Sequence, residues 1–403
     1  MTEQAKVPAI RFAGFTDPWE QRKLSEVATF GGGHTPPMAD PDNYEDGYVL
    51  WVTSQDVKSN YLDRTTTQIT EKGAKELTLY PAGSLVMVTR SGILRHTLPV
   101  AELRKPSTVN QDIRVILPQG ECCGEWLLQF FISHNKELLL EFGKTGTTVE
   151  SVDFGKIKDM LLYMPSTVEQ QQIGDFFAKL DSLITLHQRK YDKLVILKKS
   201  MLEKMFPKDG ADVPEVRFKG FTGPWERRKF GDVFEEYSEK NRADLPPLTI
   251  IQGSGTIRRD ESERALQYDK ASLSNYKVVN EGDLIVHLRS FEGGLEKANS
   301  QGIISPAYHT FHGEGVDSRF YYTYFRSKNF IDTDLKPHVY GIRDGRSIDI
   351  EGMKTIEIPF TSYPEQKLIG DAIDSINTLI SLQRRELEKL QSIKKALLEK
   401  MFV

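Results

Sequence analysis

The sequence repeats a frame made of two motifs. Residues 8–23 read PAIRFAGFTDPWEQRK and residues 214–229 read PEVRFKGFTGPWERRK. Residues 169–206 recur in the same way as residues 365–402. The first pair of motifs is 206 residues apart and the second pair 196, so the segments inside the frame differ between the halves. A period this long exceeds that of solenoid repeats, and it predicts two copies of one whole domain with its connector.

The chain has 403 residues, so each half is long enough to bury a core of its own. We predict a first domain over residues 1–165, a central helix over 166–206, a second domain over 207–361 and a C-terminal helix over 362–403. The chain begins without the pattern of a secretion signal, and no apolar run approaches the roughly 18 to 20 residues that cross a bilayer. We therefore expect a cytoplasmic protein that does not associate with membranes.

Both repeated helices begin at an S-x-x-E sequence. Ser166 with Glu169, and Ser362 with Glu365, have the spacing of a capping box, in which a hydroxyl and a carboxylate accept from each other's backbone N–H groups. Pro207 ends the first helix, because proline cannot continue the hydrogen-bond ladder. A helix of about 38 residues would be about 57 Å long.

Apolar residues recur at a 3.5-residue period along both helices, which is typical of a coiled coil. Polar residues interrupt this seam at matched places, His187 with Gln383 and Lys198 with Lys394. Because a complete domain separates the helices, we predict an antiparallel pair within one chain, although two helices that only brace the fold would show the same pattern. The seam comprises Ile173, Phe177, Leu180, Ile184, Tyr191, Leu194, Met201 and Met205 in the first helix and Ile369, Ile373, Ile376, Ile380, Leu387, Leu390, Leu397 and Met401 in the second.

A second apolar surface, called here the outer face, lies off this seam. It makes each helix apolar over a wider arc than a two-stranded pair can bury. Either a partner subunit or the chain's own domains could cover it, and we expect a partner subunit. The outer face comprises Leu183, Leu186, Leu197, Leu202, Leu379, Leu382, Ile393 and Leu398.

The segments inside the frame have the pattern of mixed α/β domains. We expect strands over residues 48–53, 84–88, 113–117 and 283–288, separated by loops that contain glycine. The predicted fold class is therefore α/β of the mixed α+β kind. It consists of two domains joined by two long helices that form an antiparallel coiled coil within the chain, with a pseudo-twofold internal repeat.

Corresponding loops of the two domains carry candidate DNA contacts. PAGSLVMVTRS corresponds to NEGDLIVHLRS, and GKTGTTVESVDF and YGIRDGRSIDI later combine basic, hydroxyl and glycine residues. Such loops can bring a guanidinium and backbone N–H groups to a phosphate or a base edge, and nearby amides could read adenine. Any one of these residues could equally be an ordinary surface side chain. The candidates are Gln55, Arg90, Ser91, Arg95, Lys144 and Thr147 in the first domain and Gln252, Arg289, Ser290, Arg343 and Arg346 in the second.

The charge of the chain does not suit a stand-alone binder of duplex DNA. The net charge is −4, with 11 basic and 15 acidic residues over 31–150 and 14 basic and 18 acidic residues over 231–345. Neutralisation of phosphates normally dominates DNA affinity, so basic groups would have to act locally or come from a partner. Leu138 stands where a phosphate-binding loop needs its first glycine, and the histidines lack metal-ligand spacing. We therefore expect neither catalysis nor a metal site.

The repeated RFxGFTxPWExRK opener, the GDLIV strand and the helix starts EQQQIGDFFAKLD and PEQKLIGDAID resemble the specificity subunit of type I restriction-modification systems. The resemblance extends over essentially the whole chain, in the order domain, helix, domain, helix. It implies a non-catalytic subunit whose two target recognition domains each read one half of a split, asymmetric DNA sequence. The helices would set the spacing of the halves and dock two methyltransferase subunits.

The resemblance also implies which ligands belong elsewhere. Double-stranded DNA would be the ligand of this chain, whereas S-adenosylmethionine, ATP and Mg²⁺ would bind to the methyltransferase subunits and to the restriction subunits that join them. Those partners could supply the phosphate contacts that two acidic domains lack. The alternative is a non-enzymatic scaffold whose two domains bind protein or glycan partners across a coiled-coil spacer. An enzyme with a degenerate site explains fewer of the features.

Overall fold

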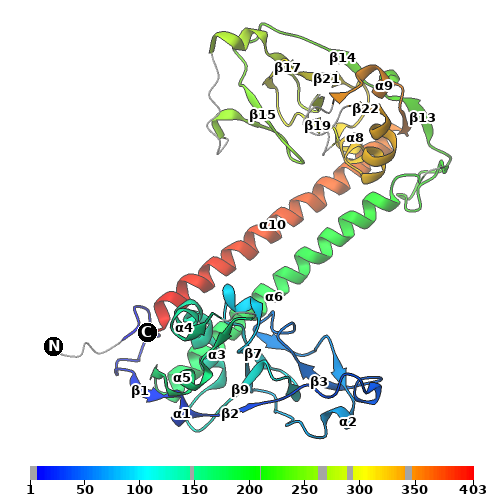
Figure 1. Ribbon diagram of the computed structural model, residues 1–403. Helices are drawn as coiled ribbons and strands as arrows, with labels where there is room; N and C mark the ends of the chain where they lie inside the picture. Colours follow the sequence, from blue (N-terminus) through cyan, green and yellow to red (C-terminus); the bar gives the residue numbers. More distant parts are fainter. Residues whose placement is uncertain (1–6, 146–148, 209, 262–269, 288–293, 341–346) are drawn as a thin grey trace. The chain divides into compact units, whose positions relative to one another are not determined.

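The chain folds into two compact units (Figure 1). The first unit contains Met1–Gln188 together with Arg385–Val403, and the second contains Arg189–Arg384. Each unit therefore combines one domain with one part of each long helix. The computed structural model describes residues 7–145, 149–208, 210–261, 270–287, 294–340 and 347–403.

A five-stranded sheet in the order β2-β9-β6-β7-β4 forms the centre of the first unit, beside a three-stranded sheet in the order β5-β3-β8. Strand β6 is buried along its whole length because both faces of its sheet are covered. Leu85 and Met87 point into one apolar cluster, and Val86 and Val88 point into another. These strands are β2 (Ala28–Gly32), β3 (Val49–Val52), β4 (Tyr61–Leu62), β5 (Gln68–Ile69), β6 (Leu85–Val88), β7 (Val100–Leu103), β8 (Ser107–Val109) and β9 (Ile113–Pro118).

Helix α3 packs on the face of the sheet that carries Leu85 and Met87, where Trp126 and Phe131 of the helix are fully buried. Strand β1 pairs antiparallel with β12, which joins the two ends of the domain next to the start of the first long helix. The other elements of this unit are β1 (Glu20–Lys23), α1 (Leu24–Val27), α2 (Glu71–Ala74), α3 (Gly124–Ser133), α4 (Asn135–Phe142), β10 (Gly143–Lys144), β11 (Ser151–Val152), α5 (Phe154–Asp159), β12 (Leu161–Met164) and the beginning of α6 (Thr167–Lys204).

The second unit repeats the frame around a different interior. Strand β13 pairs with β24 as β1 pairs with β12, and helix α8 takes the place of α3. Its largest sheet has the order β14-β21-β18-β19, while β15 and β16 form a separate hairpin. The elements are β13 (Glu226–Lys229), α7 (Phe230–Val233), β14 (Glu235–Tyr237), β15 (Leu248–Ile251), β16 (Gly255–Arg258), β17 (Lys277–Val279), β18 (Leu284–His287), β19 (Glu296–Lys297), β20 (Gly302–Ile304), β21 (Tyr308–His312), α8 (Ser318–Phe325), β22 (Val339–Tyr340), β23 (Ser347–Ile348), α9 (Ile350–Lys354), β24 (Glu357–Phe360) and α10 (Tyr363–Met401).

The mixed α+β class predicted from the sequence is confirmed. The strands expected over 48–53, 84–88 and 113–117 correspond to β3, β6 and β9. Strand β18 accounts for the described part of 283–288. The alternating burial expected of a half-covered strand is missing from β6, because a second sheet covers its other face.

The two long helices pair antiparallel within each unit. In the first unit, Phe177 near the start of α6 lies in one apolar cluster with Met401 at the end of α10. In the second unit, Met205, which directly follows α6, lies in one cluster with Ile369 near the start of α10. Every seam position predicted from the sequence is buried or half-buried. Among the described residues, no helix is both long enough and apolar enough to cross a membrane.

Both long helices start next to the predicted serines, but the glutamates bind differently from the prediction. The Ser166 hydroxyl accepts a hydrogen bond from the Glu169 N–H at 3.4 Å. The Glu169 carboxylate instead accepts two hydrogen bonds from Arg11, at 2.6 and 2.7 Å. Glu365 accepts two from Arg217 in the same way, at 2.6 and 2.9 Å. The capping-box interpretation of the carboxylates is therefore wrong, since each buried glutamate is neutralised by an arginine of the distant opener.

The glutamine that follows each glutamate connects the long helix to its domain. Gln170 accepts a hydrogen bond at 2.9 Å from the N–H of Cys123, which precedes α3. Gln366 accepts one at 3.0 Å from the N–H of Asp317, which precedes α8. Both glutamines are buried. At the start of each long helix, the glutamate therefore binds the arginine of the opener. The glutamine that follows it binds the backbone just before α3 or α8.

A phenylalanine at the end of each long helix completes the core of one unit. Phe206 follows the first domain in sequence, yet its ring packs against Trp225 of the second unit, with ring centroids 6.1 Å apart. Phe402 follows the second domain, and its ring lies 6.5 Å from Trp19 of the first unit. Each domain core is therefore completed by the helix that follows the other domain.

Candidate nucleic-acid interface

In the first unit, the two loops predicted to contact DNA lie against each other. Arg90 follows β6 and forms an isolated β-bridge with Ser151 of the second loop. The N–H of Ser91 donates to the carbonyl of Glu150 at 3.1 Å. The Ser91 hydroxyl accepts from the N–H of Ile93 at 3.5 Å and so begins a turn of 3-10 helix. The Arg90 side chain is left exposed.

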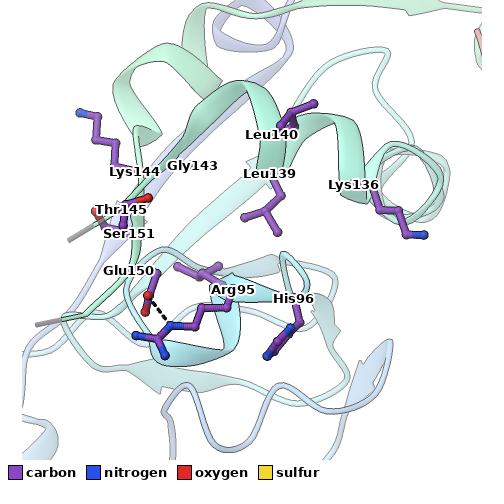
Figure 2. A pocket seen from close by; sticks show the side chains of 11 residues that line it. Arg95, His96, Lys136, Leu139, Leu140, Gly143, Lys144, Thr145, Glu150 and Ser151 are labelled. Atoms are coloured by element: carbon purple, nitrogen blue, oxygen red, sulfur yellow. Dashed lines mark hydrogen bonds and ion pairs between the residues drawn. The ribbon is translucent and has the colours of Figure 1, made fainter. Parts of the chain in front are cut away.

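These loops border an open cavity of about 570 Å³, shown in Figure 2. The predicted residues Arg95 and Lys144 both line it, although they come from different loops. His96 and Lys136 add further nitrogen-bearing side chains to its wall. The structure thus brings separate basic residues together on one surface of an acidic domain.

Two carboxylates balance the cations of this cavity. Arg95 donates to Glu150, as the dashed line in Figure 2 shows, and this hydrogen bond lowers the pKa of Glu150. The Lys144 ammonium lies 2.9 Å from Asp153 and lowers the pKa of that carboxyl. Both cations are exposed. A phosphate could therefore bind them by replacing the carboxylates, which suits backbone contact with DNA better than capture of an enclosed ligand.

Gln55, the predicted amide reader of the first domain, is exposed on a turn after β3. Asp56 stabilises this turn by accepting four hydrogen bonds, from the N–H and hydroxyl of Thr53 and from those of Thr66, at 2.6 to 2.8 Å. Burial alone would raise the pKa of Asp56, but the hydrogen bonds outweigh burial and the pKa is lowered. The side chain next to Gln55 thus holds the turn while Gln55 faces solvent.

Gln252, the predicted amide reader of the second domain, is exposed at the tip of the β15–β16 hairpin. A turn closes the tip, in which the Ser254 N–H donates to the Ile251 carbonyl at 3.0 Å. Gly253 and Gly255 have φ angles of 81° and 77°, which side-chain-bearing residues rarely adopt. The glycines of this segment are therefore required by the hairpin itself.

Five predicted contact residues lie outside the residues that the structure describes, so their roles remain predictions. They are Thr147, Arg289, Ser290, Arg343 and Arg346.

The sequence analysis missed the residues that support these tips. Glu296 binds the Gln252 hairpin from strand β19, and Asp56 binds the Gln55 turn. Asp56 carried a local sequence signal, because an aspartate side chain can accept a hydrogen bond from the backbone N–H three residues earlier. Glu296 offered no such signal, since its partners Gly253 and Gly255 lie more than 40 residues away.

The outer face of the long helices divides into exposed and buried residues. Leu398 is 8% exposed and belongs to the core of the first unit, and Leu202 packs against the core of the second. For Leu398 the expected partner surface is wrong, because the chain's own core covers it, whereas Leu202 is half-buried and its role stays a prediction. The other six are between 40% and 50% exposed, namely Leu183, Leu186, Leu197, Leu379, Leu382 and Ile393.

Residues 16–195 match the family described as the type I restriction modification DNA specificity domain. The chain is 29% identical over 186 residues to the type I restriction enzyme EcoR124I/EcoR124II specificity subunit of Escherichia coli. That match covers 43% of this chain and 46% of the subunit, so the chain spans about half the length of this relative. It is also 22% identical over 406 residues to the MjaVIII specificity subunit of Methanocaldococcus jannaschii, which covers 94% of this chain and 91% of the relative.

Among solved structures, the fold is similar to that of the S subunit of a type I restriction-modification system from M. genitalium. The TM-score is 0.64, and the alignment covers 99% of each chain. Sequence identity is 12%, so this likeness concerns the fold.

Proposed function

We propose that the chain is a specificity subunit of a type I restriction-modification system and that it selects the DNA sequence on which a type I complex acts. The match of residues 16–195 to the specificity-domain family and the similarity to the Escherichia coli specificity subunit support this proposal. Each domain would read one half of a split target, and the chain itself would catalyse no reaction. The long helices would set the distance between the two halves.

The repeated frame with unlike interiors supports this proposal most directly. Arg11 binds Glu169 and Arg217 binds Glu365 with closely similar geometry, so both domains are anchored in the same way. Their sheets nevertheless differ: among the described residues, the main sheet of the first unit has five strands and that of the second has four. Two domains that are attached by equivalent arginine–glutamate pairs but have different folds inside would be suited to reading two different half-sites.

The exposed polar tips supply chemistry for reading bases. A glutamine amide can donate to N7 of adenine and accept from its N6 amino group in a bidentate contact, and an arginine guanidinium can donate to both N7 and O6 of guanine. Gln55, Gln252 and Arg90 all face solvent. The cations Arg95 and Lys144 would contact phosphates near the first half-site.

We assign catalysis and its cofactors to partner subunits. Two methyltransferase subunits would dock on the exposed part of the outer face, which includes Leu186 and Leu382. Restriction subunits would join that complex, and S-adenosylmethionine, ATP and Mg²⁺ would bind to these partners. The assembly would work in the cytoplasm, where it meets DNA.

The deciding experiment is methylation-aware sequencing of DNA from cells that express this chain with its cognate methyltransferase. Cells that lack only this chain are the control. We expect a split motif, methylated on adenine in both halves, that is absent from the control. An identical methylation pattern in both cultures, with the two proteins shown to be associated, would reject the proposal.

A further inference from the structure

We propose that Glu296 is a positioning residue for DNA recognition, because it holds the β15–β16 tip so that the Gln252 amide can read one base of a half-site. The inference rests on the proposed function and specifies how one domain would perform it. An adenine is the base that a rigidly held glutamine amide suits best.

The Glu296 carboxylate is bound on both of its oxygens. One oxygen accepts from the Gly253 N–H at 2.8 Å and the other from the Gly255 N–H at 3.2 Å. Tyr322 donates its hydroxyl to the same carboxylate at 2.9 Å, and Arg326 pairs with it. Glu296 itself is only 7% exposed. The hairpin tip is thus attached to a buried charge rather than closed by its own backbone alone.

Further contacts hold the hairpin on strand β19. The Asn299 side-chain amide donates to the carbonyls of Ser254 and Thr256, at 2.7 and 3.0 Å. A Cβ atom at Gly255 would lie 2.5 Å from the Lys297 carbonyl oxygen, so the backbone approaches β19 too closely for any side chain there. These contacts fix the base of the tip while Gln252, Gly253 and Ser254 stay exposed.

The cost of this arrangement indicates a function. A three-residue hairpin tip with glycine can close without help, whereas burying a carboxylate is expensive unless it is fully paired. Here four donors satisfy a buried glutamate whose main effect is to order an exposed glutamine turn. Ordering before binding reduces the conformational entropy that a base-reading amide would lose on contact with DNA.

The first domain also has an exposed glutamine on a turn that a carboxylate holds in place, although the residues differ. Asp56 accepts four hydrogen bonds from Thr53 and Thr66, and the adjacent Gln55 is exposed. The two tips share no sequence pattern beyond the glutamine. Each domain thus has an exposed glutamine amide beside a carboxylate that accepts four hydrogen bonds or, for Glu296, three hydrogen bonds and an arginine contact.

The test uses the full chain reconstituted with its methyltransferase subunits. One substrate is a duplex that carries the target found by the sequencing experiment above. The others each carry one single-base change in one of its two halves, and the readout is kcat/KM for methylation. The variants are Gln252→Ala at the exposed tip and Glu296→Gln at its support. Glu314→Gln changes an exposed carboxylate of the same domain and is the matched control.

Gln252→Ala should lower discrimination about 10- to 100-fold at one position of one half-site, as expected for the loss of a bidentate base contact. Glu296→Gln should lower discrimination at that same position, because the Gly253 and Gly255 N–H groups lose their charged acceptor. Discrimination in the other half-site should not change. Glu314→Gln should match the wild type at every position.

Unchanged discrimination with Gln252→Ala would overturn the reading role of the tip, and this variant cannot fail merely by unfolding because Gln252 is exposed. A uniform loss of rate with Glu296→Gln, at unaltered discrimination, would overturn the positioning role. Failure of the proposed function itself would be visible separately, because the wild-type complex would then show no sequence preference at all.

Discussion

At the residue scale, two arginine–glutamate pairs hold the repeated frame together. The side chains of Glu169 and Glu365 are at most 1% exposed, and their arginines are 12% and 14% exposed. Each pair joins an opener to a helix start that lies about 150 residues further along the chain. The two motifs that repeat in the sequence are therefore the two sides of one contact.

Removing one partner of such a pair should be costly. Arg217→Ala leaves the Glu365 carboxylate buried without its main partner, and we expect a loss of about 3 to 5 kcal/mol in the free energy of unfolding. Urea titration of the purified chain measures this loss. Arg258→Ala is the control, because Arg258 forms a largely exposed pair with Asp260 in the same unit, and this substitution should leave the free energy of unfolding nearly unchanged. Equal losses for the two variants would contradict the structural role of the buried pair.

Glu102 makes stability depend on pH. Burial raises the pKa of Glu102 to about 7, with Arg104 opposing the rise and the nearby Glu125 adding to it. Its ordinary pKa is 4.5. Since the folded-state pKa is the higher one, the charged form destabilises the fold, and stability should decrease as the pH rises from about 5 to about 7.

Glu102→Gln should flatten that part of the stability curve. Thermal unfolding of the wild type and the variant across this pH range tests the expectation. The Tm of the variant should change less with pH than that of the wild type, and the two should converge at the acidic end. Parallel curves would assign the pH dependence to other groups.

At the element scale, the long helices could be predicted well from the sequence. Their seam follows a local 3.5-residue period, and every seam residue is buried or half-buried in the structure. What the period could not show is which other elements contact a helix. Leu398 has the pattern of a surface leucine, but the first unit's core surrounds it.

The two lysines of the seam also show that the helical period does not reveal which elements contact a helix. Lys394 lies 2.6 Å from the buried Asp181 carboxylate, which also accepts from Asn60 and Gln129 of the first domain. The matched Lys198 has its pKa lowered by burial and by the charge of Arg326. Equivalent positions in the repeat therefore have opposite electrostatic surroundings. These surroundings depend on contacts with the domains, which no helical period encodes.

The outer face gives a prediction at this scale. Leu186→Glu with Leu382→Glu should abolish co-purification with the methyltransferase, because both leucines are about half exposed and charge would oppose an apolar interface. Circular dichroism and thermal unfolding should match the wild type. Leu398→Glu is the contrast, since a charge in the core should destabilise the chain by several kcal/mol. Normal co-purification of the double variant would exclude this part of the outer face as the docking surface.

At the scale of the whole molecule, the proposed function predicts that helix length controls the target. One heptad inserted after Gln188 in α6 and another after Arg384 in α10 keeps the phase of the seam. Each helix then becomes about 10 Å longer, which corresponds to about three base pairs of B-DNA. Methylation-aware sequencing should find both half-sites unchanged and the spacer between them about three base pairs longer. An unchanged spacer would show that the helices do not set the distance.

The repeated openers and long helices could be predicted from the sequence better than the segments between them. The two domains and the helices that connect them could be predicted, because the duplication is visible in the amino-acid sequence itself. The contacts that order Gln252 join β15–β16 to β19 and α8, and long-range contacts of this kind leave no periodic signal. The base-reading residues therefore had to be inferred from loop chemistry, while the scaffold could be inferred from repetition.

The phenylalanines that end the long helices have a consequence for synthesis on the ribosome. Phe402 stacks on Trp126 in the core of the first unit, and the Ile10 N–H donates to the Lys400 carbonyl at 2.9 Å. The ribosome makes the first domain early, but the residues that complete its core are translated only after the second domain. A nascent chain therefore carries an incomplete first core throughout translation of the second half, and a premature stop there would damage both domains at once.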